Sequence, residues 1–475
     1  MRFFLRRLPR LLGWALLLYL LYALVTGIFS YWKPVHAQQA IPPEALTSRE
    51  TGPDRALLVE APQDAFSRRV EVIRAAQRTL DVTYHCVKTG ETTDCFFAEL
   101  VKAADRGVQV RVLLDGAVGG FTGEHKHLDL ALLAHPNIQY RAYNPIRLLK
   151  PWQWNVRLHD KFILADDAML MLGGRNIGDE YFDPPAYEGR VTHDRDVVVL
   201  NTAAGSVNNR SVTGQVRAYM DLLWSAPETD VPRPLTGRKL ETGQAELDRL
   251  RQLSAQWEAD WPDYYLPAVP AEELAVETRQ ITLLRNPLGT FKKEPTLGAD
   301  LTRLLQNCTS IRIQTPYATA SRGTLAALSH IARDAQVDFL TNSRASTPNL
   351  PAFSAYYSRR QKFLDTGVTL HEYQSTDSIH GKSCVADGHL SVVGSYNLDD
   401  RSIYIDTESV LVLDSPAFYE VLNGCLDHLF AQSAQVGPDN AYLPDQTVEV
   451  VEPSMAKRAL ISVVSVFSRL FQPLI

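Results

Sequence analysis

The sequence is poor in cysteine and carries no excess of basic residues. Its 475 residues include five cysteines, too few for a scaffold held together by disulfides. There are 48 lysines and arginines against 54 acidic residues, a net charge of −6. Because nucleic-acid-binding proteins are usually basic, we expect no nucleic-acid partner. Hydrophobic residues at 45% and charged residues at 21% are ordinary for a globular protein, and exclude a disordered, collagen-like or polytopic membrane chain.

Long apolar runs are also scarce, and the one that stands out lies at the N-terminus. It is an uncharged run of 19 residues, 11–29, about enough to cross a bilayer as a helix. Four arginines precede it: Arg2, Arg6, Arg7 and Arg10. Such a basic flank stays in the cytoplasm, so we predict that residues 1–40 form a single-pass anchor and that the rest is exported. The alternative is a signal peptide cleaved after Val35-His36-Ala37.

Export also bears on two cysteines, Cys86 and Cys95, which flank a polar stretch. In an oxidising compartment these two thiols could form a disulfide. The alternative is a pair of ordinary small core residues.

The exported part reads as two copies of one unit. Residues 75–116 and 307–342 both run strand, turn, helix, strand, with alternating apolar residues in the strands and helical apolar spacing between them. Such a unit predicts a parallel strand pair with a right-handed crossover. We therefore predict an α/β fold of two lobes related by a pseudo-twofold axis, with mixed sheets flanked by helices. The predicted segments are lobe 1 at 55–230, a linker at 231–275, lobe 2 at 276–435 and a C-terminal tail at 436–475.

A motif of chemically active residues recurs at the same place in both copies. Each has a histidine, a lysine two residues later and an aspartate five residues after that, then six residues and Gly-[Gly/Ser]-x-Asn. The first copy comprises His159, Lys161, Asp166 and Asn176, and the second comprises His380, Lys382, Asp387 and Asn397. Two matches in equivalent positions of a duplication indicate one shared site.

The residue types suit chemistry on a phosphodiester. One imidazole can attack phosphorus and the other can protonate the leaving oxygen. The lysines and asparagines can bind phosphoryl oxygens, so we expect neither a metal nor another cofactor. The aspartates stand beside predicted hairpin turns, where they more plausibly hold the turn than touch substrate.

Each imidazole needs a partner on its other ring nitrogen to fix its orientation. Each copy has an acid that opens the next apolar strand, Asp196 in the first and Glu408 in the second. We predict that these two carboxylates orient the histidines.

The motif resembles that of the phospholipase D superfamily over about residues 55–435. The segments 173–182 (GGRNIGDEYF) and 394–408 (GSYNLDDRSIYIDTE) resemble the bacterial cardiolipin synthases, particularly their C-type subgroup. That resemblance implies phospholipid substrates, a bacterial inner membrane location, and a phosphatidyl–histidine intermediate that an alcohol resolves. The basic flank of the N-terminal run predicts that the catalytic part faces the periplasm. It also implies His159 as nucleophile and His380 as acid and base, an order that the nearly symmetric copies do not settle. Gly174 departs from the more usual serine.

Two further segments favour contact with a membrane. Residues 147–157 place Trp152 and Trp154 among basic residues just before the first motif, which is typical of a bilayer interface. Residues 454–471 predict an amphipathic helix that either lies on the membrane or docks on the protein. The sequence leaves three functional hypotheses: lipid transfer, hydrolysis of lipid or nucleic acid, and a catalytically dead scaffold. It identifies no protein partner.

Overall fold

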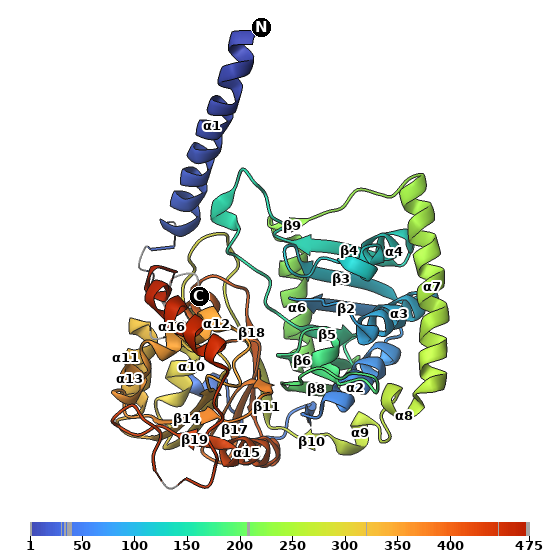
Figure 1. Cartoon of the computed structure of the whole chain (residues 1–475). Helices are drawn as coiled ribbons and strands as arrows, with labels where there is room; N and C mark the ends of the chain where they lie inside the picture. Colours follow the sequence, from blue (N-terminus) through green and yellow to red (C-terminus); the bar gives the residue numbers. More distant parts are fainter. Residues whose placement is uncertain are drawn as a thin grey trace.

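The computed structural model describes residues 2–29, 31–32, 35, 40–206, 210–319, 321–444 and 446–471, and forms two α/β lobes below one projecting helix (Figure 1). The predicted fold class is confirmed: each lobe has a mixed sheet flanked by helices. The two sheets lie against each other, and the helices cover their outer faces and ends.

The first sheet has nine strands in the order β10-β1-β8-β6-β5-β2-β3-β4-β9. Strands β2, β3 and β4 pair in parallel, and the other pairs of neighbours are antiparallel. The strands are β1 Asp54–Val59, β2 Thr79–Tyr84, β3 Gln109–Asp115, β4 Ile138–Tyr143, β5 Phe162–Ala165, β6 Met169–Gly173, β8 Asp196–Asn201, β9 Thr229–Asp230 and β10 Val276–Glu277. Its helices are α2 Pro62–Ala75, α3 Glu91–Asp105, α4 Leu128–Ala134, α5 Asp179–Phe182 and α6 Val212–Ser225.

The second sheet repeats this arrangement with eight strands in the order β11-β18-β17-β16-β12-β13-β14-β19. Here β12, β13 and β14 are the parallel strands. The strands are β11 Gln280–Arg285, β12 Ser310–Gln314, β13 Gln336–Asn342, β14 Thr369–Tyr373, β16 Lys382–Ala386, β17 Leu390–Gly394, β18 Ser409–Asp414 and β19 Ser433–Gln435. Its helices are α10 Thr296–Leu305, α11 Arg322–Ile331, α12 Leu350–Tyr357, α13 Arg360–Leu364, α14 Asp400–Tyr404 and α15 Pro416–Ala431.

A shared apolar core joins the lobes. Phe162, Leu172 and Val197 of the first sheet lie in one buried cluster with Val393 and Leu411 of the second. Helix α6 of lobe 1 packs on β11, and α15 of lobe 2 packs on β1 and β10. Side-chain caps begin these two helices, since Ser211 accepts from the Thr213 amide and Ser415 from the Phe418 amide. Strongly apolar strands bury both of their faces. Here the strands of the two sheets bury one face against each other, so the two lobes form a single folded unit.

The segment between the lobes packs against lobe 1. It forms α7 Arg238–Asp260, α8 Pro262–Tyr265 and α9 Ala271–Leu274. Trp257, Tyr264 and Tyr265 are buried in the lobe 1 core, around Phe66. These aromatic side chains therefore stabilise the lobe and do not face a membrane.

The five cysteines are all free, and no disulfide joins Cys86 to Cys95. Cys95 is buried in the lobe 1 core. The structure therefore favours the alternative of ordinary small residues in the protein.

Helix α1, Arg2–Phe29, projects away from both lobes (Figure 1). Its segment Arg10–Ile28 has a mean hydropathy of 2.1 and is 6% buried, so it is long and apolar enough to cross a membrane. At its base the Tyr19 and Tyr22 hydroxyls donate to the carbonyl oxygens of Leu148 and Leu149 at 3.0 and 3.1 Å. The loop that leads to His159 therefore lies beside the anchor.

The C-terminal helix α16, Met455–Phe471, docks on α12. Ile461 is buried, and the Ser465 hydroxyl lies 3.4 Å from the carbonyl oxygen of Ser354. Leu460 and Val463 remain exposed, whereas the side chains of Phe467, Leu470 and Phe471 lie outside the described residues. The docked reading therefore holds for the described part of the helix.

Candidate active site

The two histidines of the motif are each held by an acid from the other lobe. Nδ1 of His159 lies 2.8 Å from Oε1 of Glu408, and Nδ1 of His380 lies 2.6 Å from Oδ2 of Asp194. All four side chains are largely buried. With Nδ1 bonded to a carboxylate, Nε2 of each ring is the nitrogen that can meet substrate, and Lys382 Nζ lies 3.1 Å from Nε2 of His380.

The main chains of the two lobes also pair beside each histidine. Leu158 bridges Thr407 in parallel, and the two-residue strands β7 Thr192–His193 and β15 Ser378–Ile379 do the same on the other side. These short pairings position each histidine opposite the acid of the other lobe.

Asp196, predicted as an orienting acid, does not contact a histidine. Its Oδ2 accepts from Arg69 at 3.0 Å and Arg175 at 2.9 Å. The reason is the strand register: Asp196 pairs with Gly173 in lobe 1, whereas Val410 pairs with Gly394 in lobe 2. The register counterpart of Glu408 is therefore Asp194, two residues before the acid that opens the strand.

Asp166 and Asp387 hold the hairpin turns, as their sequence position indicates. Both have positive φ of 49°, which aspartate tolerates in tight turns. The Asp166 carboxylate accepts from the amides of residues 77–79, and that of Asp387 accepts from the amides of Thr309 and Ser310. Each fastens its turn to the start of the neighbouring strand, away from the histidines.

The lysines stand beside the histidines. Lys161 Nζ donates to the carbonyl oxygen of His159, and Lys382 Nζ donates to that of His380 at 2.5 Å. Lys382 Nζ also lies 2.9 Å from Nδ1 of His380. The two lysine ammonium groups therefore lie beside the two imidazole rings.

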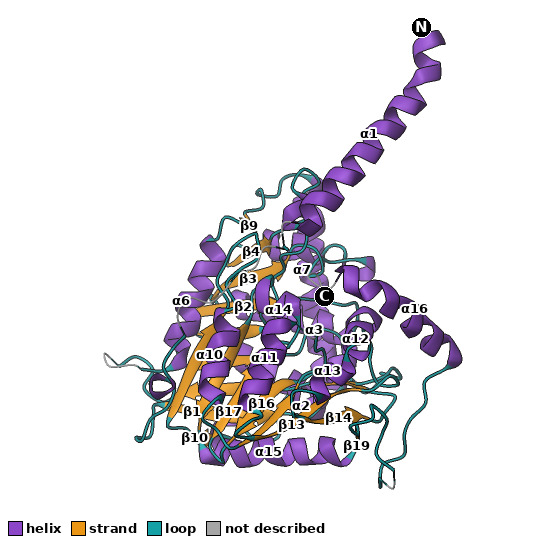
Figure 2. Cartoon of the chain, turned by 90° about the vertical axis from the view of Figure 1, so that its left-hand side faces the viewer, coloured by secondary structure: helices purple, strands orange, loops and turns teal. Residues whose placement is uncertain are grey.

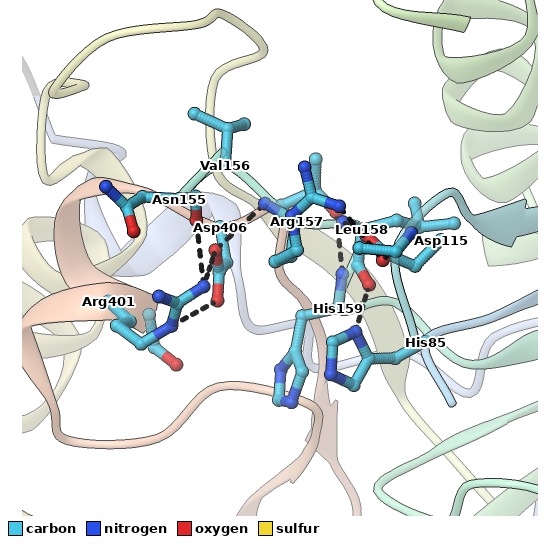
Figure 3. A network of polar contacts seen from close by, with 12 residues as sticks. His85, Asp115, Asn155, Val156, Arg157, Leu158, His159, Arg401 and Asp406 are labelled. Carbon is cyan, nitrogen blue, oxygen red and sulfur yellow. Dashed lines mark hydrogen bonds and ion pairs between the residues drawn. The ribbon is translucent and has the colours of Figure 1, made fainter. Parts of the chain in front are cut away.

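A polar network fixes the chain that precedes His159 (Figure 3). The Asp115 carboxylate accepts from the Leu158 amide at 2.9 Å and from Arg157 at 3.2 Å. Asp406 accepts from the Arg157 amide at 3.0 Å and from Arg401 at 3.0 Å. In lobe 2 the register counterpart of Asp115 is Asn342, whose side chain binds both backbone groups of Ile379 at 3.1 and 2.8 Å.

Three rings that the motif did not contain pack against the histidines. His85 lies edge-on to His159 with 4.8 Å between ring centroids, and its Nδ1 bonds to the Leu158 carbonyl at 2.7 Å. Tyr181 and Tyr317 lie edge-on to His380, at 5.7 and 5.8 Å. Asp194 could have been found from the strand register, but no sequence signal marks His85 or Tyr181.

The two asparagines of the motif lie close to the site but bond within their own lobes. Asn176 Nδ2 donates to the Tyr181 hydroxyl at 3.1 Å, and Asn397 Nδ2 donates to the Ser402 hydroxyl at 3.4 Å. The Asn397 Oδ1 is buried without a hydrogen-bond partner. Their role in binding phosphate stays a prediction.

Gly174 differs from Ser395 because the acids differ in length. The Ser395 hydroxyl donates to Glu408 Oε2. A Cβ added to Gly174 would lie 2.3 Å from Oδ1 of Asp194. The shorter aspartate thus fills the space that a serine side chain occupies in lobe 2.

Burial keeps the histidines neutral and weakens the charge of the lysines. It lowers the pKa of His159 well below its usual value, and that of His380 to about 4. It also lowers the pKa of Lys161 to about 8 and of Lys382 to about 7. An anion bound between these lysines would raise all four values and restore the lysine charges.

The orienting acids differ in electrostatic environment. Burial opposes ionisation of Asp194, but the charge of Lys382 and the hydrogen bond from His380 outweigh it and hold its pKa below the usual range. Burial raises the pKa of Glu408 well above its usual range, although Lys161 and the hydroxyls of Ser395 and Ser402 act in the opposite direction.

A polar pocket of about 500 Å³ opens at His380. Lys88, Glu180, Tyr181 and Asn349 contribute to its walls. The pocket can therefore receive an alcohol or headgroup next to the imidazole.

Within the described part of the chain, no three histidine, cysteine or acidic side chains gather in a way that could hold a metal ion.

Comparisons with known proteins agree with this geometry. The family model described as "Cardiolipin synthase, PLD-like domain" matches twice, over residues 70–212 and 301–430. Cardiolipin synthase C of Escherichia coli (strain K12) is 28% identical over 431 residues, which cover 82% of this chain and 86% of that protein. An uncharacterized protein of Helicobacter pylori (strain J99 / ATCC 700824) is 26% identical over 410 residues, 76% of each chain.

A solved structure shares the fold. The crystal structure of phosphatidylserine synthase from Haemophilus influenzae Rd KW20 matches with a TM-score of 0.61 at 14% identity, over 94% of this chain and 98% of that chain. The whole two-lobed architecture is therefore common to both proteins.

Proposed function

This chain belongs to the family described as "Cardiolipin synthase, PLD-like domain" and is an enzyme of the phospholipase D superfamily; on that premise we propose that it is a phosphatidyltransferase of the cardiolipin synthase type. The observation that carries the proposal is the pair of histidines, each bonded to an acid of the opposite lobe and each beside a lysine.

We assign nucleophilic attack to His159. A neutral Nε2 forms the bond to phosphorus, and the bond from phosphorus to the leaving alcohol breaks as that oxygen takes a proton from His380. The bound phosphate anion supplies the charge that lets His380 carry this proton. Lys161 and Lys382 neutralise the charge that develops on the phosphoryl oxygens.

The second half of the reaction reverses these roles. Neutral His380 takes a proton from an incoming alcohol, whose oxygen attacks phosphorus and releases His159. The polar pocket at His380 supports this assignment because it provides room for the alcohol next to the acid and base. In the alternative with His380 as nucleophile, the alcohol would have to lie beside His159. The pocket would then lie beside the nucleophile and not beside the acid and base.

The products of the purified full chain test the proposal. Isotopically labelled phosphatidylglycerol in detergent micelles should give cardiolipin and glycerol by mass spectrometry, whereas phosphatidic acid would show water as the acceptor and reject the transferase. His159→Ala and His380→Ala should each lower turnover by about 10⁴-fold or more. His330→Ala, a change of an exposed histidine on α11, is the matched control and should keep full activity.

We further propose that α1 anchors the enzyme in a bacterial inner membrane with both lobes in the periplasm. The four arginines before the apolar run support this orientation. An alkaline phosphatase fusion after residue 60 should be active, and a cytoplasmic reporter at the same point should be dark. The reverse pattern would refute the orientation but leave the chemistry unaffected.

A further inference from the structure

Lobe 2 contains an apolar cavity of about 540 Å³ that the reaction described above does not use. It lies between the second sheet and helices α10 and α11, which run side by side over the strands (Figure 2). Ile313, Val392 and Val410 form its floor, and small residues of the helices, among them Ala299 and Ala327, form its roof. Its volume is typical of ligand sites, which span about 300–1,000 Å³.

The duplication provides an internal control for this cavity. In lobe 1, the register counterpart of Val410 is Asp196, which binds Arg69 and Arg175 in a buried cluster. The guanidinium of Arg69 also packs on the ring of Phe182, 4.8 Å from its centroid. Charged and aromatic side chains thus fill the space in lobe 1 that apolar side chains leave open in lobe 2.

The lining of the cavity includes a residue of the catalytic motif and residues of the segment that follows the anchor. Lys382, whose Nζ contacts His380, lines it together with Thr315. Val35 and Ala40, from the segment that follows α1, line it as well. The next residue, Ile41, donates its amide to Asp300 of α10 at 2.7 Å. An apolar chain could therefore reach the catalytic lysine from the side of the protein that adjoins the anchor.

We propose that this cavity binds one acyl chain of the phospholipid donor, an inference that rests on the proposed phosphatidyl transfer. The donor phosphate then lies at the two lysines, its headgroup occupies the polar pocket at His380, and one acyl chain enters lobe 2. No residue lines both spaces, so the headgroup and the chain have separate sites. The headgroup pocket empties when the first alcohol leaves, and the acyl chain keeps the phosphatidyl group on His159 in position until the second alcohol arrives.

A pair of neighbouring alanines on α11 tests the cavity. Ala327 lines it, whereas Ala326 is exposed. Ala327→Phe should lower kcat/KM for dipalmitoyl phosphatidylglycerol by about tenfold or more and leave that for dihexanoyl phosphatidylglycerol within about twofold. Ala326→Phe should change neither value. Equal losses on both lipids, or no loss on either, would overturn the proposal.

Photolabelling of the unaltered full chain tests the cavity without relying on a variant. Phosphatidylglycerol with a diazirine in one acyl chain should label peptides of α10 and α11, and unlabelled phosphatidylglycerol should compete. Labelling confined to α1 or lobe 1 would overturn the proposal. Turnover measured in the same sample separates the two claims: labelling without transfer would reject the proposed function alone, and transfer without labelling of α10 and α11 would reject the acyl site alone.

Discussion

We propose that Asp194 and Glu408 act through the histidines to which they bind, and not on substrate. Asp194→Asn should lower kcat by about 10²–10⁴-fold, because the amide no longer fixes the tautomer of His380. Its thermal unfolding should stay close to that of the unaltered protein. Steady-state kinetics and differential scanning calorimetry measure the two effects.

Asp196→Asn is the matched control for that prediction. Asp196 binds two buried arginines and no histidine, so the change should lower the free energy of unfolding by about 3–5 kcal/mol. The kcat of the folded fraction should stay nearly constant. A stable Asp196→Asn protein with kcat reduced as in Asp194→Asn would contradict the assignment.

Gly174 and Asp194 form a matched pair, as Ser395 and Glu408 do. Gly174→Ser should lower kcat by about 10–100-fold, because the added Cβ would displace the Asp194 carboxylate. Adding Asp194→Glu should restore most of the lost activity, because in lobe 2 the longer Glu408 leaves room for the side chain of Ser395. If the double variant is no better than Gly174→Ser alone, the explanation for this glycine is wrong.

The pH profile should report the lysines. Since the pKa values of Lys382 and Lys161 are about 7 and about 8, raising the pH through this range removes their charges. The kcat/KM of the free enzyme should therefore fall above about pH 7, whereas kcat should fall at higher pH because bound phosphate holds the lysines protonated. On the acid side, His380 with a pKa of about 4 is neutral in the free enzyme and takes up its proton once the phosphate anion is bound. A kcat/KM that is flat from pH 6 to 10 would contradict this electrostatic account.

Sequence alone predicted the histidines, lysines and turn-holding aspartates because these residues recur at identical spacing. It missed Asp194 because the choice of acid depends on which residues pair across two strands. Asp196 opens an apolar strand just as an orienting acid would, but its strand is two residues out of register with that of Glu408. Tyr181 and His85 occur in one copy only. Tyr181 packs on His380 of the other lobe, and His85 packs on His159 of its own lobe, contacts that depend on tertiary packing.

At the scale of elements, the loop between β4 and β5 links the anchor to the catalytic site. Leu148 and Leu149 are 66% and 81% exposed while their carbonyl oxygens accept from the tyrosines of α1. Residues 155–158, further along the same loop, belong to the network that fixes His159. The loop therefore meets the bilayer surface if α1 spans it.

Charges placed on this loop should separate bilayer substrate from dissolved substrate. Leu148→Glu combined with Leu149→Glu should lower activity on phosphatidylglycerol vesicles by about tenfold, because two apolar side chains no longer enter the interface. Activity on dihexanoyl phosphatidylglycerol should stay unchanged. Val421→Glu alters an exposed apolar residue of α15, far from α1 in Figure 1, and should affect neither assay. Equal losses on both substrates would indicate a damaged site instead of lost membrane contact.

The sequence predicted which helices and strands form better than it predicted what each of them packs against. Apolar periodicity and caps indicate where strands and helices form, and the duplication indicates that there are two lobes. From the sequence, the aromatic residues of α7 and α8 are expected to pack on a lobe, and α16 is expected either to lie on a membrane or to dock on the protein. Their contacts with Phe66 and α12 come from the tertiary packing, which periodicity does not encode.

At the scale of the whole molecule, catalysis depends on two lobes that complete each other. Each histidine takes its orienting acid and part of its backbone pairing from the opposite lobe. Neither His159 nor His380 takes its acid from its own lobe. The lobes share a buried core, which keeps these cross-lobe distances fixed.

The two motif copies are nearly identical, but the surroundings of His159 and His380 differ. The polar pocket opens at His380 and the apolar cavity lies in lobe 2, whereas His159 is backed by His85. In the proposed mechanism, these unequal surroundings distinguish His159 as the nucleophile from His380 as the acid and base.

The measurement that tests this account most directly is the trapping of the covalent intermediate. Full-length enzyme mixed with labelled phosphatidylglycerol should be quenched in alkaline denaturant after increasing times, digested and analysed by mass spectrometry. The account predicts a phosphatidyl group on the peptide that contains His159, formed and consumed at least as fast as cardiolipin appears. A phosphatidyl group on His380 instead, or cardiolipin formed at full rate with no enzyme-bound phosphatidyl group at any time, would contradict it.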